Sequence, residues 1–374
     1  MKNKVQIKMQ GRLGNQFFIY AFAKSLLHKL QSSDNLDIKK TKVILLCDEY
    51  ENLASADIFK YNIDLSLFDL KFYGSRISSS NFFLRATRKA IYLSTGTVIR
   101  IGIKDTAKKK SFYIQLPILT ETYTQGEFDE NVIKDCLNKC LLGYFQSELY
   151  FEDIKESLKK DFVLKAPLKS KTQKALTKIR QDSKAIFVHI RRGDYLAPAN
   201  ITLYASLGAN YYKSAIKLAL EKIPDAKFYI FSDDIAWVKE EGKSLLGFEG
   251  LECEFMDLHG ENEGYLDLEL MRACKGAITA NSSFSWWGAY LIEEPKVVIA
   301  PFPFHFIHSN VDLLLDSWIV LDYKSGDVLK KEDYLYETLK TKNKQESNSK
   351  STSSYFRFHN SSGGGGGNTF RYGQ

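Results

Sequence analysis

The chain has 374 residues, which is long enough for two domains that each bury a substantial apolar core. Hydrophobic residues make up 44% and charged residues 26% of the sequence, a balance that excludes a wholly disordered chain and a membrane channel. The net charge of +7 is modest for this length and fits a polyanionic ligand, an acidic membrane surface or plain solubility.

Cysteine usage and the N-terminus indicate a compartment. The five cysteines are odd in number and scattered, which favours a reducing environment over the disulfide framework of a secreted scaffold. Residues 1–8 are polar and lead directly into a strand-like run, so we expect no signal peptide. No stretch reaches the roughly 20 apolar residues that a spanning helix needs. We therefore expect a cytoplasmic protein, or one that is peripheral on the inner face of the cytoplasmic membrane.

The first predicted elements are a strand at Val5–Met9, a tight turn, a helix over about residues 15–30 and a strand over residues 42–47. The helix has apolar residues on more than one face, which predicts that it is deeply buried. Residues 51–135 are less periodic, and the sequence does not order their elements.

The turn before this helix carries the first candidate binding motif: Gly11, Arg12, Gly14, Asn15 and Gln16. Glycines allow a ligand to approach the backbone closely, and a helix N-terminus attracts an anion. The spacing matches neither the dinucleotide-binding fingerprint nor the P-loop. A plain turn in which Asn15 caps the helix explains these residues equally well.

A basic stretch follows within the less periodic region. It comprises Arg85, Arg88, Lys89, Arg100, Lys104, Lys108, Lys109 and Lys110, with Asp105 as the only acidic residue. Such a patch can contact anionic lipid headgroups, which makes peripheral membrane contact one interpretation and a solvated face the other.

The composition suggests two domains and a tail. A polar, proline-containing stretch at residues 164–173 marks a boundary, so we expect an N-terminal domain over 1–165 and a C-terminal domain over 166–340. Residues 341–374 are rich in polar residues and glycine, and they cannot bury a core. We expect this tail to be disordered.

The second half alternates strands with helices. The predicted strands are 185–190, 226–231, 251–256, 276–280 and 296–300, and amphipathic helices fall between them. This alternation predicts an α/β fold with a parallel, doubly wound sheet. Ligands bind beyond the carboxyl ends of the strands in such sheets, so the residues after each strand are the candidates for chemistry.

Four of these candidates lie at the end of the strand over residues 185–190: His189 is its last residue but one, and Arg191, Arg192 and Asp194 come directly after it. Guanidinium groups at the end of a strand suit the oxygens of a diphosphate, because they are always charged and can donate two hydrogen bonds at once. The alternative is a salt-bridged turn in which Asp194 pairs with Arg192, which accounts for one of the arginines but not both.

Asp233 and Asp234 follow the next strand. A carboxylate there can accept two hydrogen bonds from the N1 and N2 edge of guanine. Asp234 can equally cap the helix that continues through Trp237, which leaves Asp233 as the better guanine candidate.

Asn281, Ser282, Ser283 and Phe284 follow a later strand and open a helix. Hydroxyls and backbone amides at a helix start can hold a phosphate, and adjacent aromatic rings can form the wall of a sugar or base pocket. A capped helix with buried tryptophans accounts for the aromatic residues but not for three serines in four positions.

Taken together, the motifs resemble the bacterial α-1,2-fucosyltransferases of glycosyltransferase family 11. The similarity lies in HIRRGDY, GRLGNQFFIYAFAKSL, GYFQSELYF at 143–151, FSDD and NSSFSWWGAYL, which span residues 5–300 in the family's order. The resemblance implies a GT-B-type fold, with two Rossmann-like doubly wound domains that face a cleft and GDP-fucose held mainly by the C-terminal one.

The resemblance also implies an activity. L-fucose would pass, with inversion, from GDP-β-L-fucose to the 2-hydroxyl of a terminal β-galactoside, on an oligosaccharide or on a surface glycan that can be lipid-linked. Arg191 would bind the β-phosphate. The general base stays open among His189, Asp194 and a carboxylate of the N-terminal domain. The sequence contains no Asp-x-Asp triplet, so we expect no metal and no other cofactor.

Two alternatives remain at this stage. One is a fucosyltransferase of another linkage or acceptor. The other, from a different class, is a non-catalytic basic nucleic-acid-binding protein, suggested by the charge and by 13% aromatic residues. The sequence has no recognisable nucleic-acid-binding motif, and the candidate phosphate ligands fall at strand ends, so we expect no nucleic-acid partner.

Overall fold

The computed structural model describes residues 3–47, 57–63, 100–105, 110–115, 121–124, 128–196, 198, 206–305 and 311–335. The chain divides into two compact units, Met1–Val328 and Leu329–Gln374, and every predicted site residue lies in the first. In the second unit the described residues end at 335, and residues 331–335 are helical. Apart from the backbone of residues 100–105 and 110, the predicted basic stretch lies outside the described residues, as does the predicted tail over 341–374.

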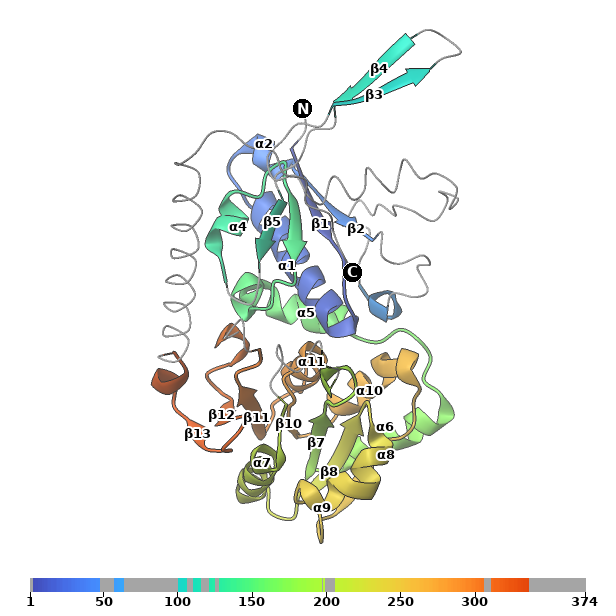
Figure 1. The fold of residues 1–374 in the computed structure, drawn as a ribbon, viewed down its shortest axis with the longest axis vertical. Coiled ribbons are helices and arrows are strands. Elements are labelled where there is room, and N and C mark those ends of the chain that lie inside the picture. The colour runs from blue at the N-terminus through green and yellow to red at the C-terminus, as the bar shows by residue number, and fades with distance from the viewer. Residues whose placement is uncertain are drawn as a thin grey trace, which may run out of the picture. The chain divides into compact units, whose positions relative to one another are not determined.

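The first half of the chain builds a parallel sheet with the strand order β2-β1-β6-β5 (Figure 1). Its strands are β1 (Lys4–Lys8), β2 (Lys42–Leu46), β5 (Glu121–Thr124) and β6 (Cys140–Gly143). The helices of this half are α1 (Leu13–Gln31), α2 (Leu36–Lys39), α4 (Glu130–Lys134) and α5 (Lys155–Asp161). Because β2 and β6 lie on opposite sides of β1, the strand order reverses beside β1.

The second half builds a sheet with the order β13-β12-β11-β10-β7-β8-β9. The strands are β7 (Ala185–Ile190), β8 (Lys227–Ser232), β9 (Cys253–Phe255), β10 (Gly276–Ile278), β11 (Val297–Phe302), β12 (Ile319–Asp322) and β13 (Val328–Leu329). The pairs from β12 to β9 are parallel. The order reverses between β7 and β10, which is where open α/β sheets bind their ligands.

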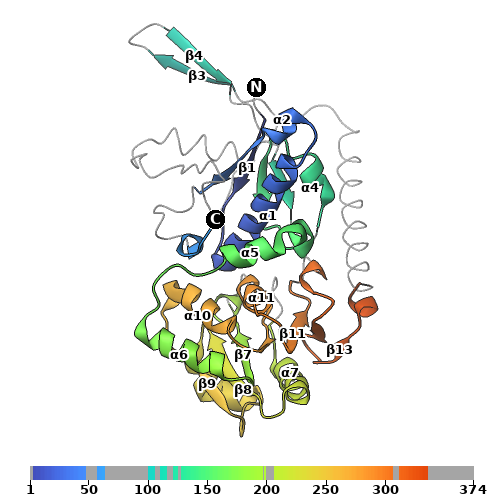
Figure 2. The same cartoon turned by 180° about the vertical axis from the view of Figure 1, so that it is seen from behind.

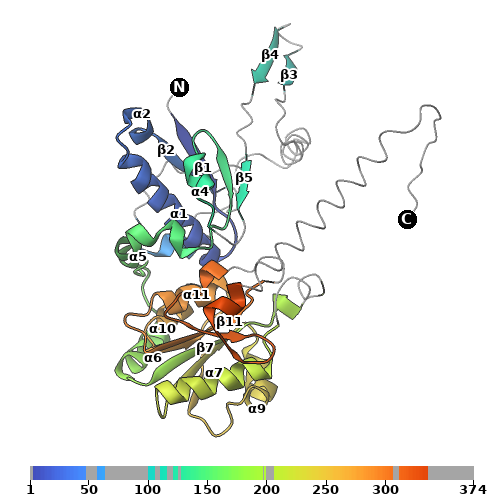
Figure 3. The same ribbon diagram turned by 90° about the vertical axis from the view of Figure 1, so that its left-hand side faces the viewer.

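Helices cover both faces of this second sheet (Figure 3). They are α6 (Ser170–Gln181), α7 (Ala209–Lys222), α8 (Ile235–Trp237), α9 (Lys243–Leu245), α10 (Gly264–Met271) and α11 (Ser283–Tyr290). Ile186 and Val188 of β7 belong to the core that α7 covers. Phe187 points the other way, towards Gly288 of α11, because neighbouring residues of a strand face opposite sides.

Short elements complete the described chain. They are the antiparallel pair β3 (Arg100–Asp105) and β4 (Lys110–Gln115), and the 3-10 helices η2 (Asp57–Lys60), η4 (Glu148–Tyr150), η5 (Glu152–Ile154), η6 (Asp194–Leu196), η8 (Glu261–Glu263) and η9 (Val311–Leu313). The segment η7 (Val238–Gly242) is a π-helix.

The helices α1 and α11 lie next to each other (Figure 2), and a buried aromatic cluster joins them. Phe17 stacks on Phe162 with ring centroids 3.9 Å apart, and it meets Tyr61 and Trp287 edge-on at 4.9 and 5.6 Å. All four side chains are fully buried. Burial of such large apolar surfaces stabilises this junction, because each ring removes a large area from water and packs at favourable angles.

The predicted α/β fold class, with parallel sheets in both halves of the chain, is confirmed. The predicted strands in both halves are present with shifts of a few residues, and β9 is shortened to three residues because it is an edge strand that pairs only with β8. The predicted boundary near residue 165 falls between α5 and α6, where the chain passes from one sheet to the other. The division into separate domains stays a prediction.

We predict that Phe17→Ala lowers the free energy of unfolding by about 3–5 kcal/mol, since it leaves a cavity in the aromatic cluster. Leu36→Ala is the control, because Leu36 is 67% exposed and should cost less than about 0.5 kcal/mol. Chemical denaturation followed by fluorescence measures both. Equal stability of the two variants would contradict a central role for this cluster.

Candidate functional site

The candidate residues gather where β1, β7 and β10 end. A Cβ atom built on Gly14, in the first turn of α1, would lie 2.5 Å from the backbone nitrogen of Phe284 in the first turn of α11. The rings of Phe284 and His189 have centroids 5.7 Å apart. The hydroxyl of Tyr195 donates to the backbone oxygen of Asn281 at 2.8 Å. Three predicted motifs from distant parts of the sequence therefore meet at one place.

Both arginines after β7 are paired with the carboxylates after β8. Arg191 Nη1 lies 3.1 Å from Asp233 Oδ2, and Arg192 Nε lies 3.2 Å from Asp234 Oδ2. Asp233 Oδ1 also accepts the backbone N–H of Arg192 at 2.9 Å. The guanidinium of Arg192 lies 3.3 Å from the ring centre of Trp237, within cation–π distance. Asp233 therefore fixes the backbone and the first guanidinium of this turn.

The ion pairs of the two arginines test two alternatives from the sequence: a pair between Arg192 and Asp194, and a helix cap at Asp234. The partner of Arg192 is Asp234, whereas the side chain of Asp194 lies outside the described part of the structure. Asp234 also accepts the N–H of Trp237 at 3.3 Å, so the predicted helix cap is confirmed. Guanine recognition by Asp233 stays a prediction, since both of its oxygens already have protein partners.

Gly193 lies between the arginines and Asp194 and has no room for a side chain. A Cβ atom at this position would lie 2.6 Å from Asp233 Oδ2. Glycine is therefore needed for the carboxylate to approach the turn, a requirement that the sequence pattern alone does not reveal.

His189 is buried at the end of β7, with 5% of its surface exposed. Its Nδ1 has no hydrogen-bond partner among the described residues. Burial, with a smaller effect of the positive charge of Arg191, lowers the pKa of His189 to about 3. The imidazole is therefore neutral at physiological pH, and it presents an unpaired nitrogen inside a polar site.

The start of α11 has hydroxyls and amides in different roles. Ser282 is the N-cap residue, yet its side chain makes no capping hydrogen bond. Ser285, in contrast, accepts the backbone N–H of Ala280 at 3.0 Å and is structural. The amide of Asn281 donates to the backbone oxygen of Phe304 at 3.1 Å. The positive end of the α11 dipole and the hydroxyl of Ser283 thus lie beside Gly14.

The motif after β1 is a tight turn that the side chain of Gln16 holds in place. Gly11 has a φ of +76°, which favours glycine. Gln16 is buried; it donates to the backbone oxygen of Gly11 at 2.9 Å and accepts the N–H of Ile58 at 3.2 Å. The interpretation of Asn15 as a helix cap is wrong, because Arg12 is the N-cap residue and Asn15 accepts a bond from Gln146 at 2.9 Å.

Sequence reasoning missed two connecting residues, Tyr195 and Gln146. Both lie inside the quoted motifs, one residue after Asp194 and three residues after β6, but their partners belong to other motifs. Their positions shortly after a strand were the one sequence feature that could have marked them as candidates. What each side chain contacts depends on the tertiary fold.

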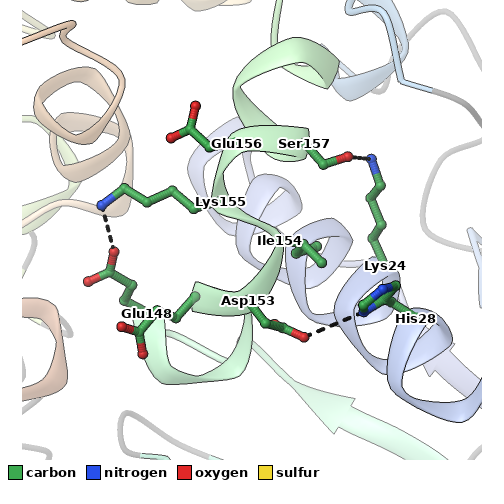
Figure 4. Close-up of a pocket in the computed structure, with 9 residues that line it drawn as sticks. Lys24, His28, Glu148, Asp153, Ile154, Lys155, Glu156 and Ser157 are labelled. Carbon is green, nitrogen blue, oxygen red and sulfur yellow. Dashed lines mark hydrogen bonds and ion pairs between the residues drawn. The ribbon is translucent and has the colours of Figure 1, made fainter. Parts of the chain in front are cut away.

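A separate pocket of about 730 Å³ lies between α1 and the segment from η4 to α5 (Figure 4). Its lining is charged, but Glu148 pairs with Lys155 at 3.1 Å and Asp153 faces His28 at 3.7 Å. It contains none of the predicted site residues. Among the described residues, no three His, Cys, Asp or Glu side chains are grouped so as to hold a metal ion, and no helix is long and apolar enough to cross a membrane.

We predict that the stability of the protein depends on pH through His189. The folded protein keeps this imidazole neutral, whereas the unfolded chain takes up a proton below about pH 6.5, so the free energy of unfolding falls as the pH drops. With a folded pKa of about 3, the loss between pH 7 and pH 5 is about 2 kcal/mol.

Denaturation of the wild type and of His189→Gln at the two pH values measures this contribution. The variant should lose about 2 kcal/mol less than the wild type. His28→Gln, which removes a histidine whose side chain is 60% exposed, should behave like the wild type. An unchanged pH dependence in His189→Gln would show that the imidazole is not kept neutral by the fold.

Comparison with known proteins places the chain in a family. The model of glycosyl transferase family 11 matches residues 4–321. An alpha-1,2-colitosyltransferase of Escherichia coli is 26% identical over 303 residues, which cover 80% of this chain and 91% of that protein. The O-antigen biosynthesis glycosyltransferase WbnK of Escherichia coli is 26% identical over 84% of this chain and 99% of its own. The human galactoside alpha-(1,2)-fucosyltransferase 1 is 25% identical over 43% of this chain and 45% of its own.

Solved structures are more distantly similar. A glycosyl transferase family 9 protein of Veillonella parvula has a TM-score of 0.41 and 12% identity, with 91% of this chain and 97% of that chain covered. The fucosyltransferase NodZ from Bradyrhizobium has a TM-score of 0.38 and 12% identity over 76% of this chain and 91% of its own. The family model, in contrast, spans both parallel sheets up to β12. The chain is a glycosyltransferase and belongs to glycosyl transferase family 11.

Proposed function

We propose that this enzyme transfers L-fucose from GDP-β-L-fucose to the 2-hydroxyl of a terminal β-galactoside, with inversion of the anomeric carbon. The observation that carries the proposal is that the end of β7 meets the start of α11 where the strand order of the second sheet reverses: His189 lies beside Phe284, and Tyr195 links Arg191 to Asn281. The relatives named as galactoside alpha-(1,2)-fucosyltransferases support the transferred sugar, the galactoside acceptor and the linkage.

In this proposal the diphosphate of the donor lies between Arg191 and the first turn of α11. Departure of GDP leaves negative charge on the β-phosphate, which a fixed guanidinium and free helix N–H groups stabilise without reorganising. Asp233 holds Arg191 in place before the donor arrives. Arg192, paired with Asp234 and packed on Trp237, supports the turn.

The proposed roles of the other residues follow from their surroundings. Gly11, Arg12 and Gly14 would meet the donor from the N-terminal side, since Gly14 touches the start of α11. A pKa of about 3 makes His189 a weak proton acceptor at neutral pH, so we assign it a hydrogen bond to the substrate. We look for the general base among carboxylates, with Asp194 as one candidate.

We further propose that the reaction needs no metal ion, because a guanidinium takes the place of the cation at the diphosphate. The acceptor would be a galactose-terminated oligosaccharide or surface glycan, including a lipid-linked one. The relative WbnK, an O-antigen biosynthesis glycosyltransferase, supports a surface glycan as the acceptor. Such an acceptor would bring the enzyme to the cytoplasmic face of the membrane.

A second donor is supported by one relative, the alpha-1,2-colitosyltransferase that aligns with 80% of this chain. Fucose and colitose differ by one hydroxyl group, and a site that hydrogen-bonds this hydroxyl discriminates strongly between the two sugars. The experiment below therefore compares the two sugar nucleotides as donors.

The test is incubation of the purified protein with GDP-fucose or GDP-colitose and a panel of galactosides, with EDTA present, followed by linkage analysis. We expect α-1,2-linked fucose on terminal galactose. Another linkage or transfer of colitose alone would replace the proposed activity. Loss of turnover in EDTA would contradict metal independence, and salt-sensitive oligonucleotide binding without transfer would favour a nucleic-acid-binding protein.

We predict that Arg191→Ala lowers kcat by about 10²–10³, because one preorganised contact to the leaving phosphate is lost. Arg180→Ala is the matched control, since Arg180 is exposed in the last turn of α6. Steady-state kinetics at saturating donor measures both, and circular dichroism checks the fold. Wild-type turnover in Arg191→Ala would remove the central assignment.

We also predict that Gly14→Ala lowers kcat by about tenfold or more, since a displacement of about 1 Å at a reacting site can cost 10²-fold. The added methyl group would overlap the backbone at Ser283 and Phe284 and push α1 away from α11. Gly208→Ala provides the comparison, because a Cβ atom there meets nothing within 4 Å. Full activity in Gly14→Ala would mean that the two helix starts need not touch.

A further inference from the structure

The imidazole ring of His259 is buried, and both of its nitrogens have hydrogen-bond partners. Its Nδ1 lies 2.5 Å from Asp267 Oδ1, and its Nε2 lies 2.7 Å from Thr172 Oγ1. The side chain has no exposed surface. None of these three residues belongs to the motifs that carry the proposed activity.

The three residues tie together separate segments of the second half. Thr172 lies in the first turn of α6, Asp267 in the first turn of α10, and His259 in the connection between β9 and α10. The ion pair between Lys169 and Glu263 joins the same two regions at the surface. The chain enters the second sheet through α6, so this network anchors the start of α10 to that entry.

The pKa of Asp267 is raised above its ordinary value, although its neighbours act on it in both directions. Burial raises the pKa of Asp267, and the negative charge of Glu263 adds to this effect. The hydrogen bond and the proximity of His259 lower it, as does the positive charge of Lys171. The side chain of Asp267 is 24% exposed, so its carboxylate is only partly shielded from solvent.

The first turn of α10 lies beside the candidate site. A Cβ atom on Gly264 would be 3.6 Å from the ring of Phe284, whose centroid is 5.7 Å from that of His189. The next residue, Tyr265, accepts a hydrogen bond from the hydroxyl of Tyr61 at 3.3 Å, and its ring lies 3.7 Å from Lys60 Nζ. A shift of this turn would therefore move the ring of Phe284, because the two are packed together.

We infer that His259 is a positioning residue: through its bond to Asp267 it fixes the first turn of α10 against Phe284, and so shapes the nucleotide-binding end of the site. This inference rests on the proposed function. The bond to Asp267, rather than the bond to Thr172, is the one that acts on the site, because Asp267 and Gly264 belong to the same turn.

Two replacements separate the two bonds of His259. The amide nitrogen of asparagine occupies the position of histidine Nδ1, whereas that of glutamine occupies the position of Nε2. His259→Asn can therefore keep a donor to Asp267, and His259→Gln keeps only the contact with Thr172. Thr172→Val removes the other end of the network.

The experiment measures the Kd of GDP by calorimetry for the full chain and these variants. His259→Gln should weaken GDP binding about tenfold, the effect of one lost charge-assisted hydrogen bond. His259→Asn should restore affinity to within about threefold of the wild type, and Thr172→Val should do the same. His28→Gln is the matched control, since His28 also faces an aspartate but is 60% exposed.

Three results would overturn the inference. Unchanged GDP affinity in His259→Gln would show that the bond to Asp267 does not act on the site. If His259→Asn and His259→Gln lose GDP affinity equally, and if these losses parallel their losses of thermal stability, His259 has only a structural role. Failure of the wild type to bind GDP would contradict both the proposed function and this inference. In the other two outcomes the wild type still binds GDP, so they contradict the inference alone.

Discussion

The candidate site depends on the direct contact between the starts of α1 and α11. Gly14 leaves no space for a side chain against Ser283 and Phe284, so the two helix N-termini meet at backbone distance. The aromatic cluster around Phe17 and Trp287 holds this contact in place from behind. Because both helices present their positive ends at the same place, the fold itself creates an environment that favours an anion.

The charged residues around the two helix starts form ion pairs, and the two arginines after β7 differ in how their pairs are built. Arg192 has a carboxylate and an indole ring as partners, which is a structural arrangement. Arg191 shares Asp233 with the backbone of the turn and keeps 16% of its side-chain surface exposed. Arg191 thus has an anionic partner in Asp233, and a bound diphosphate would be a second acceptor for its N–H donors. The neutral His189 adds a polar group without adding charge.

The strand ends were predictable from sequence because buried parallel strands read as continuous apolar runs, as AIFVHI in β7 does. The edge strand β9 is shorter than predicted, since pattern alone does not locate where hydrogen bonding stops. Asp234 as a helix cap was predictable from local spacing. The pairing of Arg191 with Asp233, the contact of Gly14 with α11 and the bond from Gln146 to Asn15 were not, because each joins residues that only the tertiary fold brings together.

The central claim is that the diphosphate of the donor binds between Arg191 and the first turn of α11. A crystal structure of the enzyme with GDP tests it most directly. The account predicts that β-phosphate oxygens lie about 2.7–2.9 Å from the guanidinium of Arg191 and face the backbone N–H groups at the start of α11. Phosphates bound away from both, for example in the charged pocket between α1 and α5, would contradict it.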